Sequence, residues 1–176
     1  RTELYLKIGL VLLGAKVDLR QFLSVGVRGV VQAVVLVTVA FYFTWWLGGR
    51  LKLDGRVRAV MSTAIAVCGV SAAIAAAAAV GARKAHLAYV TALVIMTALP
   101  MMALMPYIGK ATDMSPEWAG AWFGSSINTT AAVVAAGTIY HDTAVEIASI
   151  VKMAQSALIG IVAFLLALYW VLAVER

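Results

Sequence analysis

Charged residues are scarce in this sequence of 176 residues, since only 12% are Asp, Glu, Lys or Arg. A soluble domain carries about twice that share. The few charges gather in short clusters that separate long apolar stretches, and a helix needs about 20 apolar residues to cross a membrane. The composition therefore predicts an all-α, polytopic transmembrane helix bundle and excludes a soluble globular domain.

Cysteine and histidine are also nearly absent. The one cysteine, Cys68, rules out an internal disulfide, and the two histidines, His86 and His141, lie in different predicted loops and give no metal-ligand spacing. Neither the GxSxG nor the HExxH pattern occurs. We therefore expect no enzyme activity, no cofactor and no metal site, and the scarcity of titratable groups favours moving a solute over changing it chemically.

The basic net charge of +6 belongs to the predicted loops. In a membrane protein such cations meet lipid headgroups. We therefore expect membrane lipid, and no nucleic acid, among the partners.

The apolar stretches predict about five to six membrane segments. Residues 4–14 look like the end of a truncated helix, and residues 16–26 predict a helix lying on the membrane surface. Pro100 and Pro106 are expected to kink or end the segment that contains them. The sequence has no initiator methionine, which indicates a piece of a longer protein. The full segments are expected at 29–49, 59–82, 87–108, 117–139 and 143–174.

Local patterns predict where two helices begin. Ser115-Pro116-Glu117 is typical of a helix start, with a capping residue, Pro at the first helical position and an acid near the positive end of the dipole. Thr143 and Glu146 have the spacing of a capping box, which predicts that the last helix begins at Thr143.

The membrane orientation stays open at this level. If every segment crosses, the loops at 15–28 and 83–86 share one side and carry five Lys or Arg residues. The loops at 50–58 and 109–116 share the other side and also carry five. The positive-inside rule then gives a tie.

Two of the segments are unusually rich in small and polar residues. One reads AVCGVSAAIAAAAAVG over residues 66–81, and the other reads SSINTTAAVVAAG over 125–137. Small residues allow close helix packing, whereas helices that unwind inside the membrane line a polar site. Both interpretations stay open for the first stretch. An Asn and four hydroxyls within six positions exceed what packing requires, so residues 124–130 favour a functional cavity.

The direction of these two stretches matters for symmetry. Only one full span separates them, so two crossing helices would point the same way, whereas an inverted pair points in opposite directions. Either one stretch is re-entrant, or each has its partner outside this sequence.

Lys152 stands nine residues into the last predicted helix. A lysine near the bilayer centre costs about 3 kcal/mol and usually marks an ion or substrate path. Alternatively, residues 157–174 are enough to span, in which case Lys152 sits at the interface and snorkels.

Four motifs carry a resemblance to a known family. The motifs resemble, in the same order along the chain, those of the YeiH family of proposed sulfate exporters. These are bacterial inner-membrane proteins with roughly ten membrane-spanning segments. The resemblance covers nearly the whole chain, which would be the middle of a protein about twice as long. The motifs are YLKIGLVLLGAKVDLRQFLSVG (5–26), VCGVSAA (67–73), FGSSINTTAAVVAAG (123–137) and ASIVKMAQ (148–155).

The resemblance implies a secondary transporter that exports a small anion such as sulfate, with a mid-membrane site formed by broken helices. Coupling ion, direction and homo-oligomerisation stay open. Taken with the polar stretch itself, it gives these candidate substrate-binding residues: Cys68, Gly69, Ser71, Gly124, Ser125, Ser126, Asn128, Thr129, Thr130 and Lys152.

The chain departs from the family pattern at several positions. Members often have His followed by an acid at the positions of Asn128 and Thr129, Gln at that of Ala132 and Arg at that of Gln155. Asn and Thr do not titrate, so the pattern for proton coupling is missing here. The missing Arg removes an anion contact and leaves Lys152 as the cation to meet an anion.

Two other functions fit the same residues. A passive channel or pore subunit would use the hydroxyls as a conducting wall. A non-transporting assembly subunit would use the small residues for packing alone.

Overall fold

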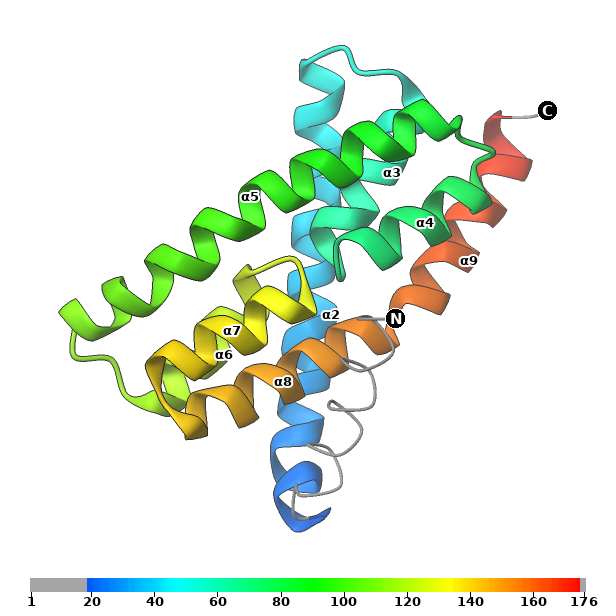
Figure 1. The fold of residues 1–176 in the computed structure, drawn as a ribbon. Helices are drawn as coiled ribbons and strands as arrows, with labels where there is room; N and C mark the ends of the chain where they lie inside the picture. The colour runs from blue at the N-terminus through cyan, green and yellow to red at the C-terminus, as the bar shows by residue number, and fades with distance from the viewer. Residues whose placement is uncertain (1–18, 175–176) are drawn as a thin grey trace, which may run out of the picture.

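The computed structural model describes residues 19–174, and throughout this range the regular elements are helices (Figure 1). The predicted all-α class is confirmed. Residues 1–18, including the expected truncated helix at 4–14, lie outside the described residues. The elements are α2 (Leu19–Arg50), α3 (Gly55–Ala66), α4 (Val70–Ala79), α5 (Lys84–Ala111), α6 (Pro116–Ser126), α7 (Thr130–Tyr140), α8 (Asp142–Ala157), α9 (Ile159–Tyr169) and the short π-helix η1 (Trp170–Val174).

Three stretches within residues 19–174 are long and apolar enough to cross a membrane. They are Val31–Arg50 in α2, Lys84–Ala111, and Asp142–Ala173, which covers α8 and α9. Most of their large apolar side chains are exposed, as expected of surfaces that face lipid or further helices. These three helices form the frame in which the shorter ones sit.

The helices α3 and α4 form a first hairpin, interrupted at residues 67–69. Val60 near its start, Val80 just after its end and Val90 in the following helix belong to one buried cluster. The chain thus enters and leaves at the same end of the molecule (Figure 1). Each arm has only 10–12 residues, or about 15–18 Å of helix, which is half the thickness of the hydrocarbon core.

The helices α6 and α7 form a second hairpin, interrupted at residues 127–129. Tyr140 closes its outer end, because the Tyr140 hydroxyl donates to the carbonyls of Gly109 and Met114, which flank the loop before α6. Lys110 Nζ also donates to the Ile139 carbonyl at 2.9 Å. This hairpin likewise returns to the end at which it entered.

The two hairpins enter from opposite ends, because the single long helix α5 leads from the outer end of the first to the outer end of the second (Figure 1). The expectation of two discontinuous or re-entrant helices is confirmed. Both turn back to the end at which they entered, whereas the sequence argument left open whether one stretch is re-entrant or each has its partner outside this sequence. The tip of each hairpin reaches the middle of the molecule.

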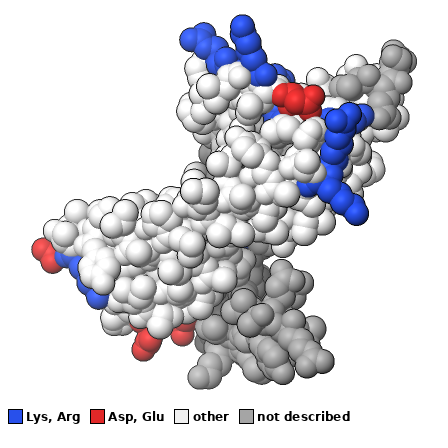
Figure 2. Space-filling model, turned by 45° about the horizontal axis from the view of Figure 1, so that its top comes forward, with Lys and Arg blue, Asp and Glu red and all other residues white. Residues whose placement is uncertain are grey.

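Re-entrance changes the distribution of charge. The loops at 50–58 and 80–86 now share one end, which we call the basic end (Figure 2). The equal number of Lys and Arg residues on the two sides is therefore wrong, because that count assumed that every segment crosses the membrane. The basic end has the cations Arg50, Lys52, Arg56, Arg58, Arg83 and Lys84 with the acid Asp54. The opposite, acidic end has Lys110 with Asp113, Glu117, Asp142 and Glu146.

Two expected helix boundaries need correction. Leu19 to Arg50 form one unbroken helix, so a separate surface helix over 16–26 is wrong in its described part, since no proline or capping turn interrupts the chain there. Pro100 and Pro106 lie inside α5 and do not end it, so of the two expected effects the kink stays a prediction.

The start of α8 also differs from the expectation. His141 Nδ1 accepts the backbone N–H of Thr143 at 3.1 Å, so His141 is the N-cap, and the helix begins one residue before Thr143. The expected start at Ser115 is confirmed, because its hydroxyl accepts the N–H of Trp118 at 3.5 Å.

Candidate functional site

Lys152 lies where the tips of the two hairpins meet. Its side chain is 1% exposed, although it belongs to the long helix α8. Lys152 Nζ donates to the Val67 carbonyl at 3.1 Å, to the Ile127 carbonyl at 2.8 Å and to Gln155 Oε1 at 3.1 Å. An ammonium has three N–H donors, so all of them are used. The Lys152 side chain therefore points into the interior of the protein and does not snorkel along its surface.

The two backbone carbonyls are available because each belongs to a helix end. Val67 is the C-cap of α3, and Ile127 is the C-cap of α6. The last carbonyls of a helix have no partner within it and carry its negative dipole end. Lys152 therefore places one positive charge between two negative helix ends and satisfies a carbonyl of each.

The hairpin tips also touch each other directly. Gly69, the N-cap of α4, has a φ of +70°, which a side chain rarely tolerates. A Cβ added there would lie 3.1 Å from the Asn128 carbonyl oxygen and 2.9 Å from Val94 Cγ1. Glycine is thus required both by the backbone conformation and by the close approach of the second tip.

Glycines on α6 allow α8 to approach closely enough to place Lys152. A Cβ at Gly120 would lie 2.7 Å from the Ala144 carbonyl oxygen, and one at Gly124 would lie 2.6 Å from that of Ala148. Such distances are too short for any side chain at these positions, as in small-residue interfaces between membrane helices. Packing is therefore the role that the structure gives to Gly124.

A hollow of about 430 Å³ lies beside the second tip. Its wall is formed mainly by apolar side chains of α3 and α5, with Ser126 and Asn128 of the second tip and Thr97 of α5 as its polar residues. The N-terminus of α7 follows directly at Thr130, and no side chain caps it. Uncapped N–H groups at a positive helix end are suited to an anion.

The candidate residues of the sequence argument fall into two groups. Those of the first group belong to the two tips: Ser126 and Asn128 line the hollow, Gly69 lies against Asn128 and Thr129, and Cys68 and Thr130 are their neighbours in the chain. The other candidates on α4 and α6 do not line the hollow. Ser125 donates its hydroxyl to the Trp122 carbonyl at 3.1 Å within its own helix, and the side chain of Ser71 is exposed on α4.

Three groups of the site were missed from the sequence: the carbonyls of Val67 and Ile127 and the side chain of Gln155. A backbone carbonyl leaves no mark on a pattern of side chains. Gln155 did leave a signal, because it stands three residues after Lys152 and therefore on the same helix face. The resemblance marks Gln155 only as a departure from the family pattern.

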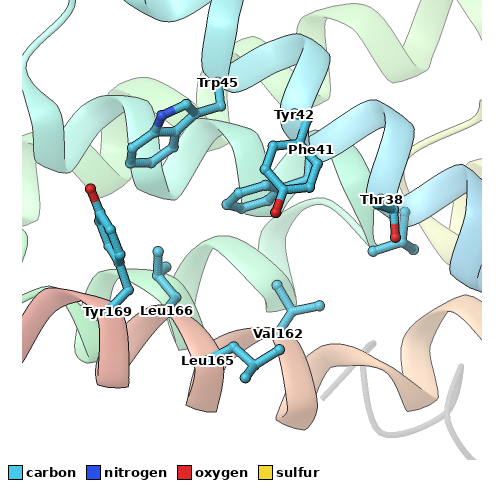
Figure 3. A pocket seen from close by; sticks show the side chains of 9 residues that line it. Thr38, Phe41, Tyr42, Trp45, Val162, Leu165, Leu166 and Tyr169 are labelled. Carbon is cyan, nitrogen blue, oxygen red and sulfur yellow. The ribbon is translucent and has the colours of Figure 1, made fainter.

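A second, apolar groove of about 400 Å³ lies between α2 and α9, where side chains of both helices face the space between them (Figure 3). Its lining is mainly aromatic and aliphatic, and, like that of the hollow beside the second tip, it has no charged residue. Within residues 19–174, no group of three or more His, Cys, Asp or Glu side chains is placed to hold a metal ion.

The chain is similar to known proteins over nearly its whole length. The family model described as "Conserved hypothetical protein 698" matches residues 1–175. A UPF0324 membrane protein of Rhodopirellula baltica is 45% identical over 99% of this chain and 33% of its own length. One of Nitratidesulfovibrio vulgaris is 40% identical over 99% of this chain and 31% of its own length. The chain thus spans about a third of these relatives. No solved structure was found to match it.

Proposed function

The chain belongs to the family of conserved hypothetical protein 698, and we propose that it forms part of a secondary transporter that moves a small inorganic anion across a membrane without changing it chemically. The observation that supports this is Lys152, a buried cation held between two broken helices. Broken helices whose ends meet inside a membrane are the usual architecture of a transporter's solute site.

The anion site is proposed at the hollow beside the second tip. There Ser126 and Asn128 line the hollow, Asn128 would supply an amide donor, and Thr129 and Thr130 stand at the uncapped start of α7. Lys152 is fully hydrogen-bonded and buried, so it acts on the anion through its charge and by holding the tips, without direct contact. A charge inside the membrane acts over several ångströms because the surroundings are weakly polar.

A carrier accounts for this arrangement better than a passive pore. Gly69 lies against the Asn128 carbonyl, so a solute that passes between the tips requires them to separate. Alternating access of that kind moves one group of helices against another around a fixed site.

Sulfate is the first solute to test, because the motifs of this chain resemble those of the YeiH family. In proteoliposomes that contain the full-length protein, we expect saturable sulfate flux. Asn128→Ala is expected to raise the KM for sulfate about 10-fold to 100-fold, because a hydrogen bond to a charged group is lost. The measurement is initial flux against sulfate concentration, with folding checked by size-exclusion chromatography.

Thr138→Ala is the matched control for Asn128→Ala. Thr138 is exposed on α7, and its hydroxyl donates only to the Val134 carbonyl one turn earlier. Its removal should leave the KM unchanged. Equal effects of the two substitutions, or no flux of sulfate or another small anion in the wild type, would argue against the proposed site.

We also propose that the protein lies in the bacterial inner membrane with its basic end in the cytoplasm. The basic end gathers six Lys or Arg residues, whereas the described side chains of the acidic end include one, Lys110. Arg20 and Arg28, in the first turns of α2, are two further Arg positions on the acidic side. The basic end still has more Lys and Arg residues, and this excess favours it as the cytoplasmic end.

Labelling of cysteines tests this orientation in intact cells. Leu51→Cys at the basic end and Thr112→Cys at the acidic end both replace exposed, uncharged residues, and other exposed cysteines of the full-length protein would be removed. A membrane-impermeant maleimide should label only Thr112→Cys until the cells are opened. The reverse pattern would overturn the assignment.

A further inference from the structure

The surroundings of the Lys152 ammonium are those of a bound cation. Three uncharged oxygens from three different helices lie 2.8–3.1 Å from Nζ: the Val67 carbonyl, the Ile127 carbonyl and Gln155 Oε1. Gln155 is itself 2% exposed, so the third oxygen is as buried as the ammonium. Rings of backbone carbonyls are what proteins use to replace the hydration shell of a monovalent cation.

The charge of this oxygen cluster also suits one positive charge. The C-terminal end of a helix carries a partial charge of about −0.5, and two such ends, those of α3 and α6, point at the same place. The cluster has no carboxylate, whereas magnesium and calcium sites in proteins rely on carboxylate oxygens. It therefore matches a monovalent cation and not a divalent metal.

We propose that Lys152 is a tethered cation: its ammonium permanently occupies a monovalent-cation site formed by the Val67 carbonyl, the Ile127 carbonyl and Gln155. A free ion such as ammonium or potassium would fill this site if the lysine side chain were removed. The tips are then held together without any cation from solution. This proposal deepens the proposed function, because it names how the two hairpins are joined. The cation site itself rests only on the hydrogen-bond geometry around Lys152.

Lys152→Ala in the purified full-length protein tests the proposal, because it removes the ammonium and leaves space for an ion. In choline chloride its Tm should lie below that of the wild type. Ammonium chloride or potassium chloride at the same ionic strength should raise the Tm saturably, by about 2–4 °C or more. The Tm of the wild type should stay the same when choline is exchanged for ammonium or potassium.

Lys152→Met is the control, because its unbranched side chain fills much of the same space without charge. It should be destabilised and should not respond to any of the cations. Equal responses of Ala and Met variants would indicate a general salt effect and overturn the proposal. A Tm of Lys152→Ala that does not change with ammonium or potassium would also overturn it. Aggregation of Lys152→Ala in every salt would do the same, because the ions expected to replace the ammonium would have been present.

Flux through the wild type gives a second measurement. Replacing sodium and potassium by choline on both sides of the vesicles should leave anion flux unchanged, and a strict requirement for either ion would count against the tethered cation. The Tm experiment needs no transported solute. If the wild type moves no anion, the proposed function fails while the cation site is still decided by the Tm data.

Discussion

Lys152→Met is expected to abolish anion flux and to lower the free energy of unfolding by about 3–5 kcal/mol, because three buried acceptors lose their donor at once. Two of those acceptors are carbonyls at opposing helix ends, which then repel each other. The tips should separate, and the hollow beside Asn128 should lose its shape. Flux in proteoliposomes and thermal unfolding in detergent measure the two effects.

Lys110→Met is the matched control. Lys110 also donates to a backbone carbonyl, that of Ile139 at 2.9 Å, but it is exposed at the acidic end. An exposed interaction of this kind contributes little, so flux and Tm should stay close to those of the wild type. If Lys152→Met keeps wild-type flux and stability, Lys152 neither joins the tips nor serves the transport path.

Gly124→Val should prevent the second hairpin from packing against α8. Even the first carbon of the new side chain would lie 2.6 Å from the Ala148 carbonyl oxygen and 2.9 Å from Val151 Cβ. The backbone of α8 has to move, which costs about 1–3 kcal/mol or more for an overpacked interior. Because Val151 precedes Lys152, this movement also pulls the ammonium away from Ile127. We expect a large loss of folded protein, measured as the monomodal peak on size-exclusion chromatography.

Gly160→Val separates this effect from the general consequence of a branched residue in a membrane helix. Among the residues that the structure describes, no neighbouring atom lies within 4 Å of a Cβ added at Gly160 in α9, so the larger side chain meets none of them. Its yield should equal that of the wild type. A Gly124→Val protein that folds as well as Gly160→Val would contradict the close contact between α6 and α8.

The long helices were the part of the fold most accessible from the sequence. An apolar run such as that of α5 is recognisable as long and apolar enough to cross a membrane, although it contains two prolines. The hairpins were harder, because α3 and α4 together have the length of one span. Whether such a stretch crosses or turns back depends on contacts with distant residues, here Trp170 against Gly55.

The candidate site was predictable only in part, for a similar reason. The polar stretch around Asn128 and the isolated Lys152 both stand out in an apolar chain, and the structure brings the tip that holds Asn128 to Lys152. What joins them is the carbonyl of Ile127, an apolar residue. Its oxygen is available only because the helix stops there, and the sequence alone does not give the place where α6 ends.

Synthesis from the N-terminus adds an order of events to this geometry. Val67 precedes Lys152 by 85 residues and Ile127 precedes it by 25, so both tips are made before the group that joins them. Until α8 is in place, two helix ends with free carbonyls require water or other parts of the membrane machinery as partners. The tips of the two hairpins are therefore not joined during the early steps of insertion, and they become joined only when α8 places Lys152 between them.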